Sequence, residues 1–359
     1  MEYQMERSMK QDTALRPMRR WLAAAGAAAM LFAGAASAQT LQFASPFPEA
    51  DFTSQFLKRW TEGVTKESGG RIKFRLHWAG SLVGNKMVDG MRDGVVDGAL
   101  TFTPYVSGEI LDLAPMDVPF SYPLEIKGLT AFHREALPLV DAIYEKKGSR
   151  AVAAPPMLLP DPLTCADRFL SGPDKWQGAL VRTAGRWQAE SVKRWGGSPV
   201  VLAPADLYSA LEHKTVNCTL MVYNIVKSMK LYEPAKFITR VDHSIAFGSI
   251  NVSNRTWAKL SEGDRAIMLK VGEELLTWGS AEYTRAYAAT LKDLKDLGAK
   301  FCVPNQKEFD RLIAAANDVL DKEISGKTTP DGTKLIELIK RYRPSVMARP
   351  QVGDMTACP

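Results

Sequence analysis

Arg182 stands where a positively charged side chain could hold an anion. Residues 175–182 run from a turn into a predicted strand that ends at this arginine, and Thr183-Ala184-Gly185 then opens a predicted helix. A guanidinium can bind both oxygens of a carboxylate, and the free amides at a helix N-terminus add donors. Arg182 is therefore a candidate carboxylate clamp, with an ordinary surface ion pair as the alternative. Arg186 and Trp187 are further candidate ligand contacts, and for these two a helix surface is the alternative.

Signatures of other chemistry are missing from the sequence. There is no G-x-S-x-G elbow and no G-x-G-x-x-G loop, and Ser325-Gly326-Lys327-Thr328 lacks the first glycine of a P-loop because Asp321 stands there. The four histidines (His77, His133, His213 and His243) include no pair at the spacing of a helical metal site. The sequence therefore predicts no metal and no cofactor.

The composition is that of a soluble globular protein of about two domains. The 359 residues are 46% hydrophobic and 24% charged, and 46 Lys and Arg stand against 40 Asp and Glu, a net charge of +6. The basic residues are scattered, without a run that alternates with aromatic residues, so we expect no nucleic-acid partner.

The first 38 residues have the layout of a secretory signal peptide. Arg16, Arg19 and Arg20 precede a short apolar stretch at 21–32, and Ala36-Ser37-Ala38 fits a cleavage site. We expect cleavage after Ala38, export to the periplasm and no stable membrane insertion, because no later segment is long and apolar enough to span a bilayer. An uncleaved anchor is the alternative, and the export route stays open.

The four cysteines allow two disulfides, in three possible pairings. Cys358 lies in a C-terminal tail that would fray without a tether. Cys302 is the candidate partner, which would leave Cys165 to pair with Cys218. Four independent buried thiols are the alternative.

Hydrophobic periodicity predicts alternating strands and helices. Strands are expected at 41–44, 72–78 and 98–103, and helices at 53–68 and 85–92, with Phe56, Trp60 and Val64 on one buried stripe. This order of βαβ units indicates an α/β fold with parallel strands. A long helix is predicted from the capping box at Ser261 to about Leu297.

Residues 87–104 and 207–224 share an apolar pattern, with Asp97 aligned to Asn217. Each segment is predicted to form a helix, a tight turn and a strand. The repeat suggests two similar domains, although helix–turn–strand units often look alike.

A family resemblance rests on an ordered set of short motifs. Residues 41–260 resemble the solute-binding proteins of tripartite ATP-independent periplasmic (TRAP) transporters, the dicarboxylate-binding type. The motifs are SGGRI at 68–72, AGSLVG at 79–84, VPF at 118–120, LVR at 180–182, GGSPV at 196–200, DLYSAL at 206–211 and KLYEPAKFIT at 230–239.

The resemblance implies a two-lobed periplasmic-binding-protein fold with a long helix spanning both lobes. We expect one lobe from 39–160 and 247–286 and the other from 161–246 and 287–359. A small organic acid would bind between the lobes and be delivered to a TRAP membrane permease, without catalysis. The alternative is a periplasmic enzyme or a ligand sensor on the same scaffold.

The resemblance also implies the ligand-binding residues. Arg182 matches the family's carboxylate-binding arginine, and Arg168 corresponds to a second basic residue on the preceding crossing strand. Phe47, Tyr105, Met221 and Asn224 complete the expected set. The chain departs from the family at 216–220, where VNCTL replaces the usual V-D-G-Q-E, which puts the usual hydrogen bonding to sugar acids and simple dicarboxylates in doubt.

Overall fold

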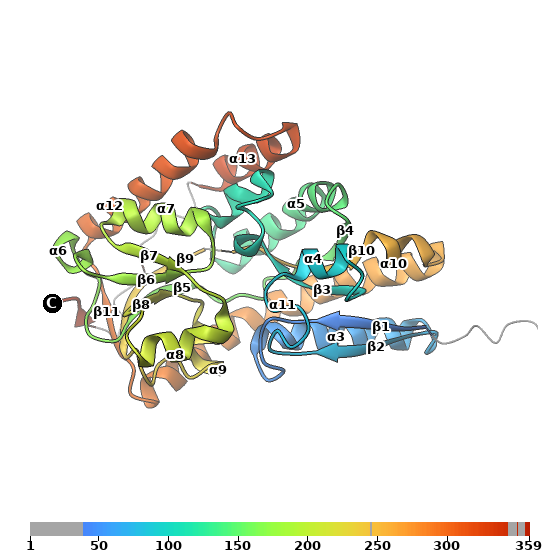
Figure 1. The fold of residues 1–359 in the computed structure, drawn as a ribbon, viewed down its shortest axis with the longest axis horizontal. Coiled ribbons are helices and arrows are strands. Elements are labelled where there is room, and N and C mark those ends of the chain that lie inside the picture. Colours follow the sequence, from blue (N-terminus) through green and yellow to red (C-terminus); the bar gives the residue numbers. More distant parts are fainter. Residues whose placement is uncertain (1–38, 245, 344–349, 351–355) are drawn as a thin grey trace, which may run out of the picture. The chain divides into compact units, whose positions relative to one another are not determined.

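Five strands form the first of two β-sheets (Figure 1). In this computed structural model, which describes residues 39–244, 246–343, 350 and 356–359, the strand order is β2-β1-β3-β10-β4. The strands are β1 (Gln39–Ala44), β2 (Ile72–His77), β3 (Gly98–Phe102), β4 (Ser149–Ala153) and β10 (Gly248–Ser253). Glycine is required where β3 begins, because a Cβ at Gly98 would lie 2.2 Å from the ring of Phe43.

Seven strands form the second sheet, in the order β12-β11-β9-β5-β8-β6-β7. They are β5 (Asp161–Cys165), β6 (Leu180–Thr183), β7 (Ser198–Val201), β8 (Cys218–Leu220), β9 (Phe237–His243), β11 (Lys300–Val303) and β12 (Thr356–Ala357). Arg182 thus lies on β6, whose parallel neighbours are β7 and β8.

The helices alternate with these strands as the sequence predicts. They are α3 (Phe52–Glu67), α4 (Met87–Arg92), α5 (Ile126–Glu145), α6 (Pro173–Trp176), α7 (Arg186–Trp195), α8 (Leu207–Glu212), α9 (Tyr223–Ser228), α10 (Asn254–Lys259), α11 (Glu262–Asp296), α12 (Gln306–Asp318) and α13 (Pro330–Tyr342). The shorter turns are η1 (Thr103–Tyr105), η2 (Leu111–Asp117), η3 (Pro204–Asp206) and η4 (Val319–Ile324).

Each sheet contains one strand that runs antiparallel to both neighbours. β10 is antiparallel to β3 and β4, and β5 is antiparallel to β8 and β9. The prediction of parallel strands holds for β1 with β3 and for β6 with β7 and β8, but it is wrong for β5 and β10. β5 follows β4 and β10 follows β9, each a strand of the other sheet, so neither is reached through the crossover helix that parallel pairing needs.

α11 is the third connection between the two sheets. The Ser261 hydroxyl accepts a hydrogen bond from the Asp264 amide at 3.1 Å, which caps the helix as the sequence predicts. α11 then packs against α3 and α9 and leads into β11 (Figure 1). The predicted α/β class, with two lobes and a long helix reaching both, is confirmed.

The sequence repeat corresponds to two equivalent turns. The Asp97 carboxylate accepts the Gln42 amide at 2.8 Å, and the Asn217 side-chain oxygen accepts the Leu180 amide at 2.8 Å. In both turns the backbone amide of the same residue also donates to that strand, to the carbonyl of Gln42 or of Leu180. The Asp/Asn match therefore marks one way of joining a helix–turn–strand unit to the neighbouring strand, used once in each sheet.

The core between α3 and α11 explains the predicted apolar stripe. Phe56, Trp60 and Val64 are fully buried, and the Trp60 indole donates to the carbonyl of Met268 on α11 at 3.2 Å. Near the other end of the chain, α13 packs against α5 and η2. This part of the predicted second lobe thus lies against elements that were expected in the first.

Two disulfides join neighbouring strands of the second sheet. Cys165 on β5 is bonded to Cys218 on β8, and Cys302 on β11 is bonded to Cys358 beside β12. The second bond holds the described end of the chain against β11, where β12 pairs in parallel.

The predicted signal peptide, residues 1–38 with its cleavage site, lies outside the described residues. From Thr40 onward the chain forms one compact unit that holds both sheets. No helix in the described part of the chain is long and apolar enough to cross a membrane.

Candidate ligand-binding site

The Arg182 side chain is buried, with only part of its donor set in use. It is 1% exposed, and its Nε and Nη1 donate to the carbonyls of Leu202 at 3.0 Å and Leu220 at 3.1 Å. Nη2 has no hydrogen-bond partner among the described residues. Burial lowers the pKa of the guanidinium, while Tyr105 and Asp161 nearby raise it. An arginine stays protonated in proteins, so a buried cation here presents one free donor edge.

A small cavity of about 30 Å³ lies beside this free edge. It is lined by Phe47, Phe102, Pro104, Tyr105, Leu158, Arg182, Ala184, Gln188, Met221, Val222 and Ala246. The lining residues come from both parts of the chain. Those from Phe47 to Leu158 in this list lie before or within the crossing segment 154–160, and those from Arg182 to Val222 lie in the part built on the second sheet. The cavity holds about one water molecule in this closed arrangement, so an organic ligand requires the walls to separate.

Four of the expected ligand residues meet in this cavity: Phe47, Tyr105, Arg182 and Met221. The structure does not bring Arg168 to it. β5 ends at Cys165, so Arg168 lies in the bend beyond the crossing strand and not on it, as was expected. Its guanidinium pairs with Asp167 at 2.8 Å and donates to the Gln177 carbonyl at 3.1 Å, which leaves it satisfied near the surface.

The two candidates at the start of α7 also lie outside the cavity lining. Arg186 is exposed, with its guanidinium 4.8 Å from the centre of the Trp187 ring. Trp187 is buried, and its indole donates to the Ser107 carbonyl at 3.1 Å. Trp187 therefore joins α7 to the loop between η1 and η2, and it presents no polar atom to a ligand.

Asn224 is occupied by protein partners. Its side-chain amide donates to Asp51 at 3.1 Å and to Thr53 at 2.9 Å, and its oxygen accepts the Leu159 amide at 3.2 Å. All four residues are buried. Asn224 thus connects the start of α9 to the start of α3 and to the crossing segment.

Asp117 was not predicted, yet it lies against the N-terminus of α7. The N-cap of α7 is Gly185, without a side-chain bond of its own, and a Cβ at this glycine would lie 2.1 Å from the Pro104 carbonyl oxygen. Burial raises the pKa of Asp117 to about 8, although hydrogen bonds from Ser107, Gln188 and the Trp187 amide lower it. Asp117 therefore lies beside the first turn of α7, whose amides the sequence predicts as donors to the ligand.

Asp161 is a second buried carboxyl group near Arg182. It lies opposite His243 on β9, with Nε2 of the histidine 3.7 Å from Oδ1, and neither carboxyl oxygen has a hydrogen-bond partner of good geometry in the described chain. Burial raises the pKa of Asp161 well above its usual value, against the lowering effects of Arg182 and the Met221 amide. Burial also lowers the pKa of His243 to about 3. Burial thus favours the neutral form of both groups, which leaves the Arg182 charge available to an anion.

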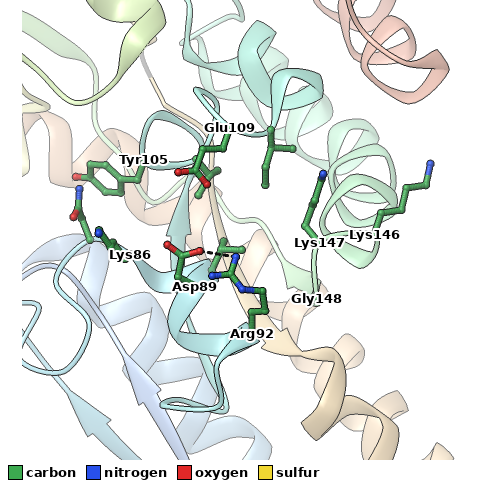
Figure 2. Close-up of a pocket in the computed structure, with 12 residues that line it drawn as sticks. Lys86, Asp89, Arg92, Tyr105, Glu109, Lys146, Lys147 and Gly148 are labelled. Carbon is green, nitrogen blue, oxygen red and sulfur yellow. Dashed lines mark ion pairs between the residues drawn. The ribbon is translucent and has the colours of Figure 1, made fainter.

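Tyr105 also lines a larger cavity of about 660 Å³. Figure 2 shows its charged lining, which includes Lys86, Lys147 and the ion pair of Asp89 with Arg92 at 2.8 Å. These lysines and Arg92 are exposed. Because water already solvates them, they have less to gain from a ligand than the buried Nη2 of Arg182.

Cluster geometry gives no sign of a metal centre. Within the described ranges, no group of three His, Cys, Asp or Glu side chains is arranged to hold a metal ion.

Comparison with known sequences identifies the family. The model of the bacterial extracellular solute-binding proteins, family 7, matches residues 43–326. A solute-binding protein of Sulfitobacter sp. is 25% identical over 309 residues, which are 83% of this chain and 91% of that protein. The 2,3-diketo-L-gulonate-binding periplasmic protein YiaO of Escherichia coli is 22% identical over 307 residues, 84% of this chain and 92% of that protein.

Solved structures show the same fold. A TRAP periplasmic solute-binding protein from Desulfovibrio salexigens, with bound orotic acid, superposes with a TM-score of 0.77 at 18% identity over 86% of this chain and 99% of that one. With these matches to the fold and to nearly the full length of its relatives, the chain belongs to family 7 of the bacterial extracellular solute-binding proteins.

Proposed function

We propose that this protein captures a small organic carboxylate in the periplasm and delivers it to a TRAP-type membrane permease. The observation that carries the proposal is the Arg182 guanidinium, buried, oriented by two backbone carbonyls and left with a free Nη2 beside a cavity. A buried donor without a partner is costly unless a ligand uses it. The similar proteins named above bind acids, orotic acid in one case and a diketo sugar acid in another.

Access to Arg182 requires movement of two lobes. We propose lobes of 39–160 with 247–286 and of 161–246 with 287–359, except that α13 packs on the first lobe against α5 and η2. The segments near Pro160 and Ser244 would act as hinges. The bonds of Trp187 to Ser107 and of Asn224 to Asp51 cross between the lobes and would break on opening. A ligand that touches both lobes favours the closed state by that difference in contact. Export would follow cleavage after Ala38.

We propose binding without turnover. Among the described residues lining the cavity, the groups with chemistry are one guanidinium, one phenol and one amide, from Arg182, Tyr105 and Gln188. None of these is a nucleophile activated by a neighbouring base.

The test is a thermal-shift screen of organic acids on the mature protein, followed by calorimetry of the best ligand. Arg182→Ala should weaken binding by about 2–5 kcal/mol, the range for truncating one partner of a buried charge pair. The matched control is Arg168→Ala, which removes an arginine already paired with Asp167 and should leave the affinity unchanged. Equal affinity of wild type and Arg182→Ala would refute the carboxylate clamp.

A further inference from the structure

The Arg182 cavity carries a single positive charge. Of the described lining residues, Arg182 alone is cationic, and the lining contains no acidic side chain. One free guanidinium edge can pair with one carboxylate. A second carboxylate on the same ligand would be buried without a cation, which proteins avoid.

The rest of the lining is mostly apolar. Phe47, Phe102, Leu158, Met221 and Val222 surround the space next to Arg182, together with Pro104, Ala184 and Ala246. The rings of Phe47 and Phe102 lie 5.3 Å apart, and that of Tyr105 lies 6.1 Å from Phe102. These three aromatic rings, neighbours in space, form an apolar wall that can pack against a flat or branched hydrocarbon group.

Apart from the Tyr105 phenol, which interacts with Arg182, the polar side chains in and near this wall already have protein partners. The Gln188 oxygen accepts the Ala184 amide at 2.9 Å, and its side chain also hydrogen-bonds Asp117. Asn224 is bonded to Asp51, Thr53 and Leu159, and Trp187 is bonded to Ser107. The hydroxyls of a sugar acid would therefore lose their water and gain few replacements, at a cost for each group left unpaired.

We propose that the ligand is a monocarboxylate with an aromatic or branched aliphatic body, held by Arg182 at its carboxylate and by the Phe47, Phe102 and Met221 side chains at its body. The inference rests on the proposed function, because it names the ligand class of the same site. It separates this chain from neighbours of the same fold whose bound ligands are galacturonate and glucuronate.

The test compares acids of similar size on the mature protein by calorimetry. The probes are phenylacetate and 4-methylpentanoate against galacturonate, gluconate and malate. We expect an apolar monocarboxylate to bind on the order of 100-fold more tightly than the polyhydroxy acids or the dicarboxylate, because each buried hydroxyl without a partner costs roughly tenfold in affinity.

Two variants separate this inference from the proposed function. Met221→Gln adds an amide to the apolar wall, so it should reduce the affinity ratio of apolar monocarboxylates to polyhydroxy acids at least about tenfold. Arg182→Ala should weaken the binding of every acid by a similar factor. Circular dichroism and thermal melting check that each variant folds. If galacturonate, gluconate or malate binds most tightly, and Arg182→Ala abolishes that binding, the proposed ligand class is wrong and the carboxylate clamp is supported. Binding of no acid, or binding that ignores Arg182, would overturn both.

Discussion

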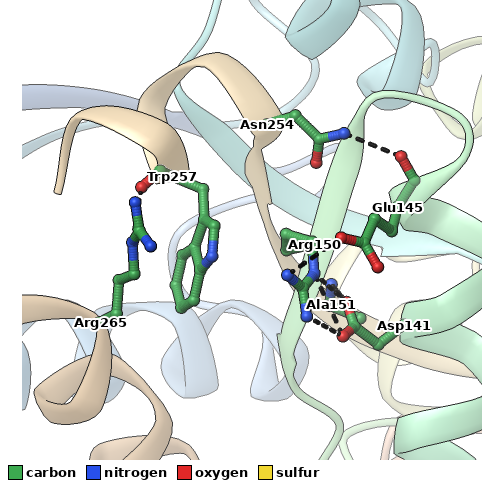
Figure 3. Close-up of polar contacts among 7 residues, drawn as sticks. All are labelled: Asp141, Glu145, Arg150, Ala151, Asn254, Trp257 and Arg265. Atoms are coloured by element: carbon green, nitrogen blue, oxygen red, sulfur yellow. Dashed lines mark hydrogen bonds and ion pairs between the residues drawn. The ribbon is translucent and has the colours of Figure 1, made fainter. Parts of the chain in front are cut away.

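Arg150 and Arg182 are both strand arginines, but the chain treats them in opposite ways. Arg150 on β4 gives its Nε and Nη2 to the carboxylate of Asp141 at 2.9 and 2.6 Å, and its guanidinium lies 5.6 Å from the Trp257 ring (Figure 3). The Asp141 carboxylate also raises the pKa of Arg150. Arg182 on β6 donates to two backbone carbonyls and interacts with the Tyr105 phenol, and its Nη2 has no hydrogen-bond partner of good geometry among the described residues.

The comparison shows that a protein can orient a guanidinium without neutralising its charge. A carboxylate partner, as at Arg150, fixes the guanidinium and cancels its charge, which suits a residue that ties α5 to β4. Two carbonyls, as at Arg182, fix the plane of the guanidinium and leave the charge in place. Because a buried charge without a counter-ion costs stability, the Arg182 arrangement is worth keeping only where a ligand completes it.

The largest expected effect concerns the disulfides, which differ in their distance from Arg182. Cys165–Cys218 joins β5, which carries Asp161, to β8, whose Leu220 carbonyl holds Nη1 of Arg182. Replacing either pair by Ala should lower the free energy of unfolding by about 4 kcal/mol at most, from the chain entropy of loops of this length. Only loss of Cys165–Cys218 should also weaken ligand binding.

Denaturant unfolding and calorimetry on the two double variants measure both quantities. Mass spectrometry of the exported protein, digested without reduction, checks the pairs first. Free thiols at Cys302 and Cys358 would remove the tether, and equal ligand affinity in both variants would remove the distinction between them.

The second prediction concerns the substitution of Arg182 by lysine, which keeps the charge but loses the planar guanidinium. Arg182→Lys should weaken ligand binding by about 2 kcal/mol, because an ammonium cannot form the planar double contact with a carboxylate. The unliganded protein should change in unfolding free energy by only about 1 kcal/mol, since the ammonium keeps the charge and can still donate to one of the two carbonyls that hold Arg182. Undiminished affinity in calorimetry would show that charge alone holds the ligand.

The third prediction is that the free energy of unfolding falls as the pH rises through neutrality, because of the buried carboxyl group of Asp117. Asp117 has its pKa raised to about 8, so the folded protein keeps a proton that the unfolded chain has lost, and this stability is lost as the pH rises towards 8. His133 and His243, with pKa values lowered to about 4 and about 3, act in the opposite sense, and their effect ends near pH 6.5.

Between about pH 6.5 and 8 only the effect of the buried carboxyl groups remains. The unfolding free energy should there fall by up to about 1.4 kcal/mol per pH unit because of Asp117. The raised pKa of Asp161 adds in the same direction. Urea unfolding at several pH values should therefore show a flatter profile for Asp117→Asn than for wild type. A slope identical in the two proteins would contradict the role given to Asp117.

Local patterns predicted much of this fold and the main candidate of the site. The match of Asp97 to Asn217 marked equivalent turns, and the position of Arg182 at the end of a strand and before a helix led to the proposed carboxylate clamp. Asp117 and Asp161 were missed because their importance depends on segments distant in sequence, α7 and β9. Arg168 was misplaced because sequence similarity could not show that β5 ends at Cys165 and that Asp167 neutralises the charge.

The smallest expected effect belongs to Arg150. Arg150→Lys keeps the charge but loses the double contact with Asp141, so the unfolding free energy should fall by about 1 kcal/mol, a shift of about 2 °C in the melting temperature. The pair is partly solvated, with Arg150 27% and Asp141 19% exposed, which limits the cost. Arg265→Lys is the matched control, since this second arginine beside Trp257 bonds to backbone carbonyls and should cost less. Ligand affinity should stay at the wild-type value in both variants. A loss of affinity in Arg150→Lys as large as in Arg182→Lys would show that the two arginines are coupled, and the distinction between a structural and a binding arginine would fail.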